Sequence, residues 1–255
     1  MGQIFTAPEV INPVDPLSEI NISNGKNNTG ENNNEPNLGL FPPADIESDE
    51  PELESSLHLH QIFLLISCLE LLWQERNDYF VAGNLSIYFK PEPNRPTEFR
   101  GPDFFVVLGT QKKERKSWVV YHEGGIYPHV IVEILSDSTA QVDRTTKKLL
   151  YQNVFRTPNY FWFDPETLEF QGFHLVEAEY VVLQPNARGH LWSSQLHMFL
   201  GVHEGKLRYF TAAGDLVPTA AEAWKHEQSR ADRESQRSEK LAAKLRELNI
   251  DPEQI

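Results

Sequence analysis

The spacing of apolar and polar residues divides the chain into three parts. Residues 1–56 have neither helical nor strand periodicity and are rich in Asn, Pro, Asp and Glu, which is typical of a disordered acidic tail. From Leu57 to Glu75 apolar residues recur every three or four positions, and this spacing predicts an amphipathic helix. Over residues 218–255 there is no Gly and, between Pro218 and Pro252, no Pro, while similar residues repeat every seven positions. This pattern predicts a long C-terminal helix with coiled-coil character.

Between these parts, short apolar runs alternate with turn residues, as expected of β-strands. Runs that are apolar throughout predict strands buried on both faces, whereas alternating runs predict strands with one solvated face. The predicted strands are residues 79–90, 104–108, 130–135, 160–163, 170–175, 180–183 and 206–211. A second helix is predicted over residues 143–155, ahead of Pro158. The order of elements predicts an α/β domain over residues 57–217, in which helices flank a mixed β-sheet.

Charge and composition narrow the classes of function. The net charge is −14, but residues 1–56 hold 11 Asp or Glu and one Lys, a net of −10, so residues 57–255 carry only −4. The acidity therefore does not exclude a nucleic-acid partner for the domain. No apolar run reaches the roughly 20 residues of a membrane span, and the N-terminus carries no export signal. Because the single cysteine, Cys68, also suits a reducing compartment, we expect a soluble, cytoplasmic protein.

Two carboxylates stand where the predicted core is most apolar. Asp103 directly precedes the strand at 104–108, and Glu133 lies inside the run at 130–135. A buried carboxylate is costly unless a cation or hydrogen bonds compensate its charge. If the two side chains converge, they could hold a hard divalent ion such as Mg²⁺, whose other ligands are usually water and phosphate oxygens. Asp103 and Glu133 are therefore the candidate metal ligands.

A lysine on the second predicted helix completes the candidate site. Lys147 lies four residues after Asp143 and four before Tyr151, which places all three on one helix face. A lysine that faces the carboxylates could stabilise charge on a phosphate or help to deprotonate the attacking water. A purely structural reading stays open, because a strand-end Asp often caps a turn, a buried Glu can pair with an Arg, and a helix Lys is usually solvated.

Other titratable residues fit the site less well. Glu70 and Glu75 are read as solvated residues of the first predicted helix and are left out of the site. His58 and His60 are two positions apart, so they point to different faces of that helix and make a poor ligand pair. The four basic residues within the segment 111–116 form either a solvated loop or a phosphate-facing patch.

The candidate residues belong to a series of short motifs. The series is Pro102-Asp103, Val132–Ser136 with Ser138-Thr139, then Asp143, Lys147 and Tyr151, then Asn159–Trp162 with Asp164-Pro165. As a set it resembles the Uma-two family of restriction-endonuclease-like proteins, which belongs to the PD-(D/E)XK nuclease superfamily. The resemblance covers about residues 57–210, and the end of the chain is similar to the helical C-terminus common in these proteins.

The resemblance implies a DNA endonuclease with a restriction-endonuclease-like core, in which Asp103 and Glu133 hold Mg²⁺, or Mn²⁺ in its place. The sequence departs from the superfamily at Leu135, where a Lys is expected two residues after the second carboxylate. Lys147 occupies the place from which the family supplies the lysine, whereas Lys148 lies about 100° further round the helix. Two functions follow: an enzyme that cuts DNA, for which a homodimer would suit two strands, or an inactive nuclease fold that acts as a binding or scaffold module.

Overall fold

The computed structural model describes residues 42–50, 53, 55–90, 98–136 and 143–247. Helices and π-helical turns alternate with strands in the order expected of an α/β protein. The elements are α1 (Ser56–Leu72), β1 (Tyr79–Gly83), β2 (Ile87–Lys90), β3 (Glu98–Arg100), β4 (Phe104–Leu108), β5 (Trp118–Val119), β6 (Val130–Ile134), η1 (Asp143–Lys147), α3 (Lys148–Leu150), η2 (Tyr151–Phe155), β7 (Asn159–Phe163), β8 (Phe170–Val176), β9 (Glu179–Val182), β10 (Leu191–Ser193), β11 (Met198–His203), β12 (Lys206–Phe210) and α4 (Ala220–Glu247).

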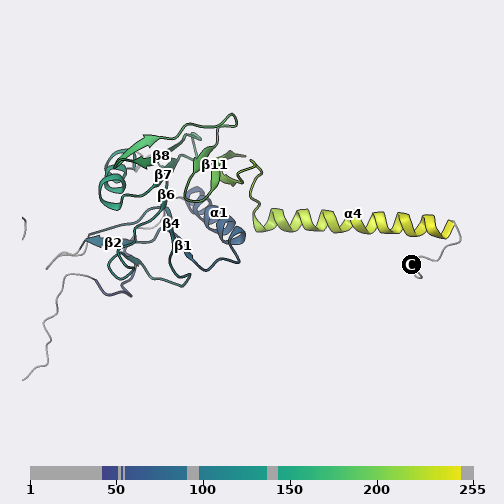
Figure 1. Ribbon diagram of the computed structural model, residues 1–255, viewed down its shortest axis with the longest axis horizontal. Coiled ribbons are helices and arrows are strands. Elements are labelled where there is room, and N and C mark those ends of the chain that lie inside the picture. The colour runs from purple at the N-terminus through teal and green to yellow at the C-terminus, as the bar shows by residue number, and fades with distance from the viewer. Residues whose placement is uncertain (1–41, 51–52, 54, 91–97, 137–142, 248–255) are drawn as a thin grey trace, which may run out of the picture. The chain divides into compact units, whose positions relative to one another are not determined.

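A six-stranded sheet with the order β1-β4-β6-β7-β8-β9 runs through the domain (Figure 1). Only β6 and β7 of this sheet are parallel, and the other neighbours are antiparallel. A parallel pair needs a crossover connection, and here the helical segment η1–α3–η2 provides it. The predicted mixed sheet is confirmed, and its crossover places the helical segment directly after β6.

Strand alternation gives β6 two different faces. Val130, Val132 and Ile134 join α1 and the small sheet β10-β11-β12 in one hydrophobic cluster. Ile131 and Leu135 join the other cluster, which contains residues of β2, β5 and η2. Because successive strand residues point to opposite faces, Glu133 shares the second face, which carries the crossover helix.

Several predicted boundaries differ from the structure. The segment 79–90 was predicted as one strand, but it forms β1 and β2, which lie in different sheets. The break falls at Asn84, whose φ of 47° is a left-handed conformation that ends a strand. The strands β3, β5, β10 and β11 were not predicted. The first three have only two or three residues, too few for a period to be recognised, whereas β11 has six residues and is interrupted by Gly201.

The N-terminal region was expected to be disordered as far as residue 56, yet its residues 42–50 contact the domain. Ser48 and Glu50 bond the hydroxyl of Ser86, and the backbone carbonyl of Glu47 accepts a hydrogen bond from Tyr88. The helix α1 begins at Ser56, where the Ser55 side chain caps its first turn. The contacts of residues 42–50 were not predicted, because their partners lie more than 30 residues away along the chain. Periodicity along the sequence does not indicate contacts of this kind.

The C-terminal helix α4 spans Ala220–Glu247 and buries none of its residues. It is anchored near its start by Glu222, whose carboxylate pairs with the buried Arg208 guanidinium of β12 at 2.6 Å. The predicted helix over 218–255 is therefore present as far as residue 247, and residues 248–255 lie outside the described residues. Within the described ranges, no helix has the length and apolarity needed to cross a bilayer.

Candidate active site

Glu133 is fully buried at the fourth position of β6. Its carboxylate accepts a hydrogen bond from the Tyr151 hydroxyl to Oε1 at 2.6 Å and lies 3.1 Å from Lys147 Nζ through Oε2. Tyr151 and Lys147 stand four residues apart on the crossover helix, and both point to the same carboxylate. These contacts compensate a charge that would otherwise be costly in an apolar strand.

Asp103 precedes β4 and lies beside Glu133. The backbone N–H of Asp103 donates to Glu133 Oε2 at 3.3 Å, and the N–H of Ile134 donates to Asp103 Oδ2 at 2.7 Å. These reciprocal bonds place the two carboxylates next to each other. Burial acts to raise the pKa of Asp103, but the contact with His58 and the charge of Lys147 outweigh it, so the pKa lies below its ordinary value.

His58 is one of two residues near the site that the sequence pattern did not point to. It is buried on α1, and its Nε2 lies 3.0 Å from Asp103 Oδ1. His60 is exposed, so the two histidines do not form a pair, as expected. The signal in the sequence was that His58 is in helical register with the buried residues Ile62, Leu65 and Leu69, which placed it on the core face of the helix.

Glu50 was missed as well, and no sequence signal pointed to it. Its carboxylate accepts a hydrogen bond from Ser86 Oγ at 3.0 Å and lies directly against the Cα of Gly101, where a Cβ would collide with it. Burial raises the pKa of Glu50, although the Ser86 hydrogen bond and the charge of Lys147 oppose the shift. Gly101 therefore leaves room for a third carboxylate near Asp103.

The two predicted ligands match a hard divalent ion in their chemistry. Mg²⁺ is commonly bound by one or two carboxylates, with water and phosphate oxygens as its other ligands, and Asp103 and Glu133 supply two adjacent carboxylates. In the described part of the chain, no three His, Cys, Asp or Glu side chains are arranged as a complete metal cage. Glu70 and Glu75 are exposed, and Glu70 lies 3.5 Å from Lys112.

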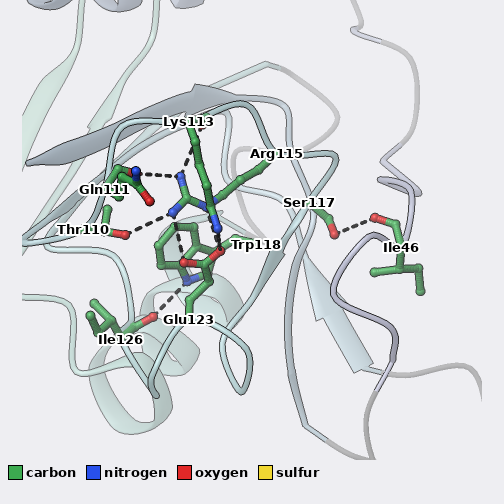
Figure 2. Close-up of polar contacts among 9 residues, drawn as sticks. All are labelled: Ile46, Thr110, Gln111, Lys113, Arg115, Ser117, Trp118, Glu123 and Ile126. Atoms are coloured by element: carbon green, nitrogen blue, oxygen red, sulfur yellow. Dashed lines mark hydrogen bonds and ion pairs between the residues drawn. The ribbon is translucent and has the colours of Figure 1, made fainter. Parts of the chain in front are cut away.

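The basic residues of the segment 111–116 pair with the protein's own carboxylates. Arg115 donates to both oxygens of Glu123, at 2.7 and 3.0 Å, and its side chain is only 4% exposed (Figure 2). Its guanidinium also lies over the rings of Phe80 and Trp118. Lys116 pairs with Glu47 at 2.6 Å. Arg115 thus holds this loop onto the domain, which favours the structural reading of the segment.

Comparison with known protein families gives the family of this chain. The fold is that of a mixed α/β protein in which two carboxylates lie side by side and a lysine pairs with one of them. The chain belongs to the Uma2 family, described as "Putative restriction endonuclease", whose family model matches residues 49–202 and therefore more than half of the chain. The matched range contains Glu50, His58, Asp103, Glu133 and Lys147, and it ends before α4.

Several solved chains are similar to this one. One of them is described as the crystal structure of a "putative nuclease belonging to DUF820" from Anabaena variabilis. It is 15% identical, and the match covers 58% of this chain and 76% of that chain with a TM-score of 0.41, a value too low to carry an argument. No curated protein matches the chain.

Proposed function

We propose that this protein is a metal-dependent DNA endonuclease of the PD-(D/E)XK type, with Asp103 and Glu133 as metal ligands and Lys147 as the catalytic lysine. The observation that carries the proposal is the contact of 3.1 Å between Lys147 Nζ and Glu133 Oε2. The superfamily position two residues after Glu133 holds Leu135, which is buried and apolar. Lys147 brings an ammonium group to the same carboxylate from the next helix.

The side chains divide the work of phosphodiester hydrolysis among them. The Lys147 side chain is 19% exposed, and its ammonium would stabilise the negative charge that develops on the phosphate during attack. Tyr151 holds the Glu133 carboxylate in one orientation through its short hydrogen bond, and His58 Nε2 lies 3.0 Å from Asp103 Oδ1, which restricts that carboxylate as well. Such fixed partners reduce the reorganisation that the site needs during the reaction.

A divalent ion, Mg²⁺ or Mn²⁺, would bind between Asp103 and Glu133. Bound there, it would supply a water of lowered pKa and neutralise charge at the leaving oxygen. The donor set supports this assignment, because both ligands are hard carboxylate oxygens that lie side by side. The substrate would be DNA, as the family description suggests. A homodimer would allow both strands to be cut. The single cysteine, Cys68, is buried and free, which suits a protein of the cytoplasm.

A second function is favoured by one specific observation. Both oxygens of Glu133 and both oxygens of Asp103 already have protein partners at 3.3 Å or less. A cluster satisfied in this way can also serve stability alone. The alternative is a nuclease fold that binds DNA or a protein as a scaffold without cutting.

Cleavage of supercoiled plasmid distinguishes these functions. The wild type should nick the plasmid with Mg²⁺ or Mn²⁺ and stop when the ion is chelated, and Glu133→Ala should be inactive. Exposed Lys113, which lies 3.8 Å from Glu123, offers the control variant Lys113→Ala, which should cut like the wild type. Equal cutting by wild type and Glu133→Ala would assign the activity to another site or to a contaminant.

A further inference from the structure

Next to the candidate active site, two basic side chains lie over one tryptophan. Arg144 Cζ is 6.0 Å and Lys148 Nζ is 5.8 Å from the centroid of the Trp162 ring, and Lys148 Nζ is 3.8 Å from the Phe173 ring. Arg144 and Lys148 are four residues apart on the crossover helix, so they share one face. This face lies beside the one that carries Lys147.

The cluster has more donors than acceptors. Trp162 is 8% exposed, and neither its buried Nε1–H nor the buried Nε–H of Arg144 meets a hydrogen-bond acceptor within the described structure. Buried donors of this kind are rare in folded proteins. Arg144 bonds one carboxylate, that of Glu169, through its Nη2.

Lys148, unlike Arg144, has no carboxylate partner among the described residues. Its ammonium lies over the rings of Trp162 and Phe173, and no carboxylate of the described residues lies within ion-pair distance of it. Burial lowers the pKa of Lys148, because it disfavours the charged form of the ammonium. Positive charge and unused donors without matching acceptors are the properties of an anion site.

The position of the cluster indicates which anion it would take. Trp162 on β7 is the register partner of Glu133 on β6, so the cluster lies one strand away from the candidate active site, about 4.8 Å in the direction of the inter-strand hydrogen bonds. A DNA strand carries one phosphate per nucleotide, about every 3.4 Å along the helix axis, so a strand bound at the candidate active site presents further phosphates to the side chains beside it. A strand whose scissile phosphate lies at Lys147 would therefore bring a neighbouring phosphate to Lys148 and Arg144.

We propose that Arg144, Lys148 and Trp162 form a subsite for a DNA backbone phosphate next to the one that is cut. The assignment rests on the proposed nuclease function for its substrate, but not on catalysis. When a phosphate binds, the Arg144 guanidinium exchanges the Glu169 carboxylate for phosphate oxygens, and Lys148 gains the anionic partner that it lacks.

The test is the salt dependence of DNA binding, measured by fluorescence anisotropy with a labelled duplex and without divalent metal. The double variant Arg144→Ala/Lys148→Ala should bind more weakly, and the slope of log K against log salt should decrease by about 0.9, the value for one lost phosphate contact. Lys113→Ala should leave the slope unchanged. An unchanged slope in the double variant, or a wild type that does not bind the duplex, would overturn the subsite.

A second variant separates the subsite from a folding defect. Glu169→Gln removes the carboxylate that competes for Arg144, so it should tighten DNA binding by up to about fivefold, the factor that corresponds to a surface ion pair. A damaged fold could only weaken binding. If the slopes behave as expected but plasmid is not cut, the subsite stands and the nuclease function fails; if plasmid is cut and the slopes do not change, the reverse holds.

Discussion

Lys147 and Glu133 meet at 3.1 Å although they come from different elements, a crossover helix and a buried strand. The contact matters because Leu135, the residue two positions after Glu133, is apolar and buried. A lysine delivered from the helix can face the carboxylate as well as one delivered from the strand, since only the position of the ammonium decides its electrostatic effect. The proposed nuclease function depends on this contact.

The hydrogen bond from Tyr151 to Glu133 should contribute strongly to stability, because it joins two buried groups and its acceptor is charged. Tyr151→Phe should lower the free energy of unfolding by about 1–3 kcal/mol, measured by urea denaturation. The matched control is Tyr180→Phe, which removes a hydroxyl that donates to the neutral carbonyl of Thr157 at 3.0 Å. A larger loss in Tyr180→Phe than in Tyr151→Phe would contradict the special role of the Glu133 contact.

A glycine at position 101 should be required for full stability, because the Glu50 carboxylate occupies the space of a side chain there. Gly101→Ala would push the Glu50 carboxylate away from the Ser86 hydroxyl and should cost about 1 kcal/mol of unfolding free energy, the usual worth of a hydrogen bond. The cost should largely disappear in a Glu50→Ala background, where nothing is displaced. A double-mutant cycle measures this coupling, and additive effects would show that residue 50 does not lie against residue 101.

The Arg208–Glu222 pair should make stability depend on pH. The hydrogen bond from Arg208 lowers the pKa of Glu222 from 4.5 to about 2, so the stabilisation is present above pH 4.5 and is lost as the pH falls towards 2. Glu222→Gln should lower the free energy of unfolding by about 1–2 kcal/mol at neutral pH and by clearly less at pH 3. The figure is reduced for solvent screening, because the Glu222 side chain is 40% exposed. Glu247→Gln, in an exposed pair, should have little effect at either pH. An equal cost of Glu222→Gln at both pH values would be inconsistent with the pair.

Arg115 is expected to act on stability and not on DNA binding. Arg115→Lys loses the bidentate contact with Glu123 and the stacking on Phe80 and Trp118, so it should lower the free energy of unfolding by about 2–4 kcal/mol. The salt slope of DNA binding should stay at the wild-type value. A reduced slope with unchanged stability would instead assign the segment 111–116 to the DNA interface.

The sequence predicted those parts of the structure that depend on local patterns. The continuous apolar run around Glu133 and the helical spacing of Lys147 and Tyr151 were sufficient to predict β6 and the crossover helix. The break between β1 and β2 at Asn84 was not predicted, although Gly83-Asn84 is a pair typical of turns.

The long-range contacts could not be predicted in the same way. His58 meets Asp103 across 45 positions and Glu50 meets Ser86 across 36. The helical register of His58 indicates that it faces the core, but no periodicity identifies the partner of either residue. Glu50 also lies in a polar, acidic segment, which by composition alone is expected to be disordered. Its contacts depend on the shape of the folded domain, and the resemblance to a family does not predict them.

The most direct test of the central claim is the single-turnover rate of plasmid nicking by Lys147→Ala at saturating DNA and Mg²⁺. If Lys147 has taken over the role of the superfamily lysine, the rate should fall by about 10²-fold or more. Lys113→Ala should keep the wild-type rate, and circular dichroism should show that Lys147→Ala is folded. A folded Lys147→Ala protein that nicks plasmid at the wild-type rate would contradict the assignment of Lys147 as the catalytic lysine.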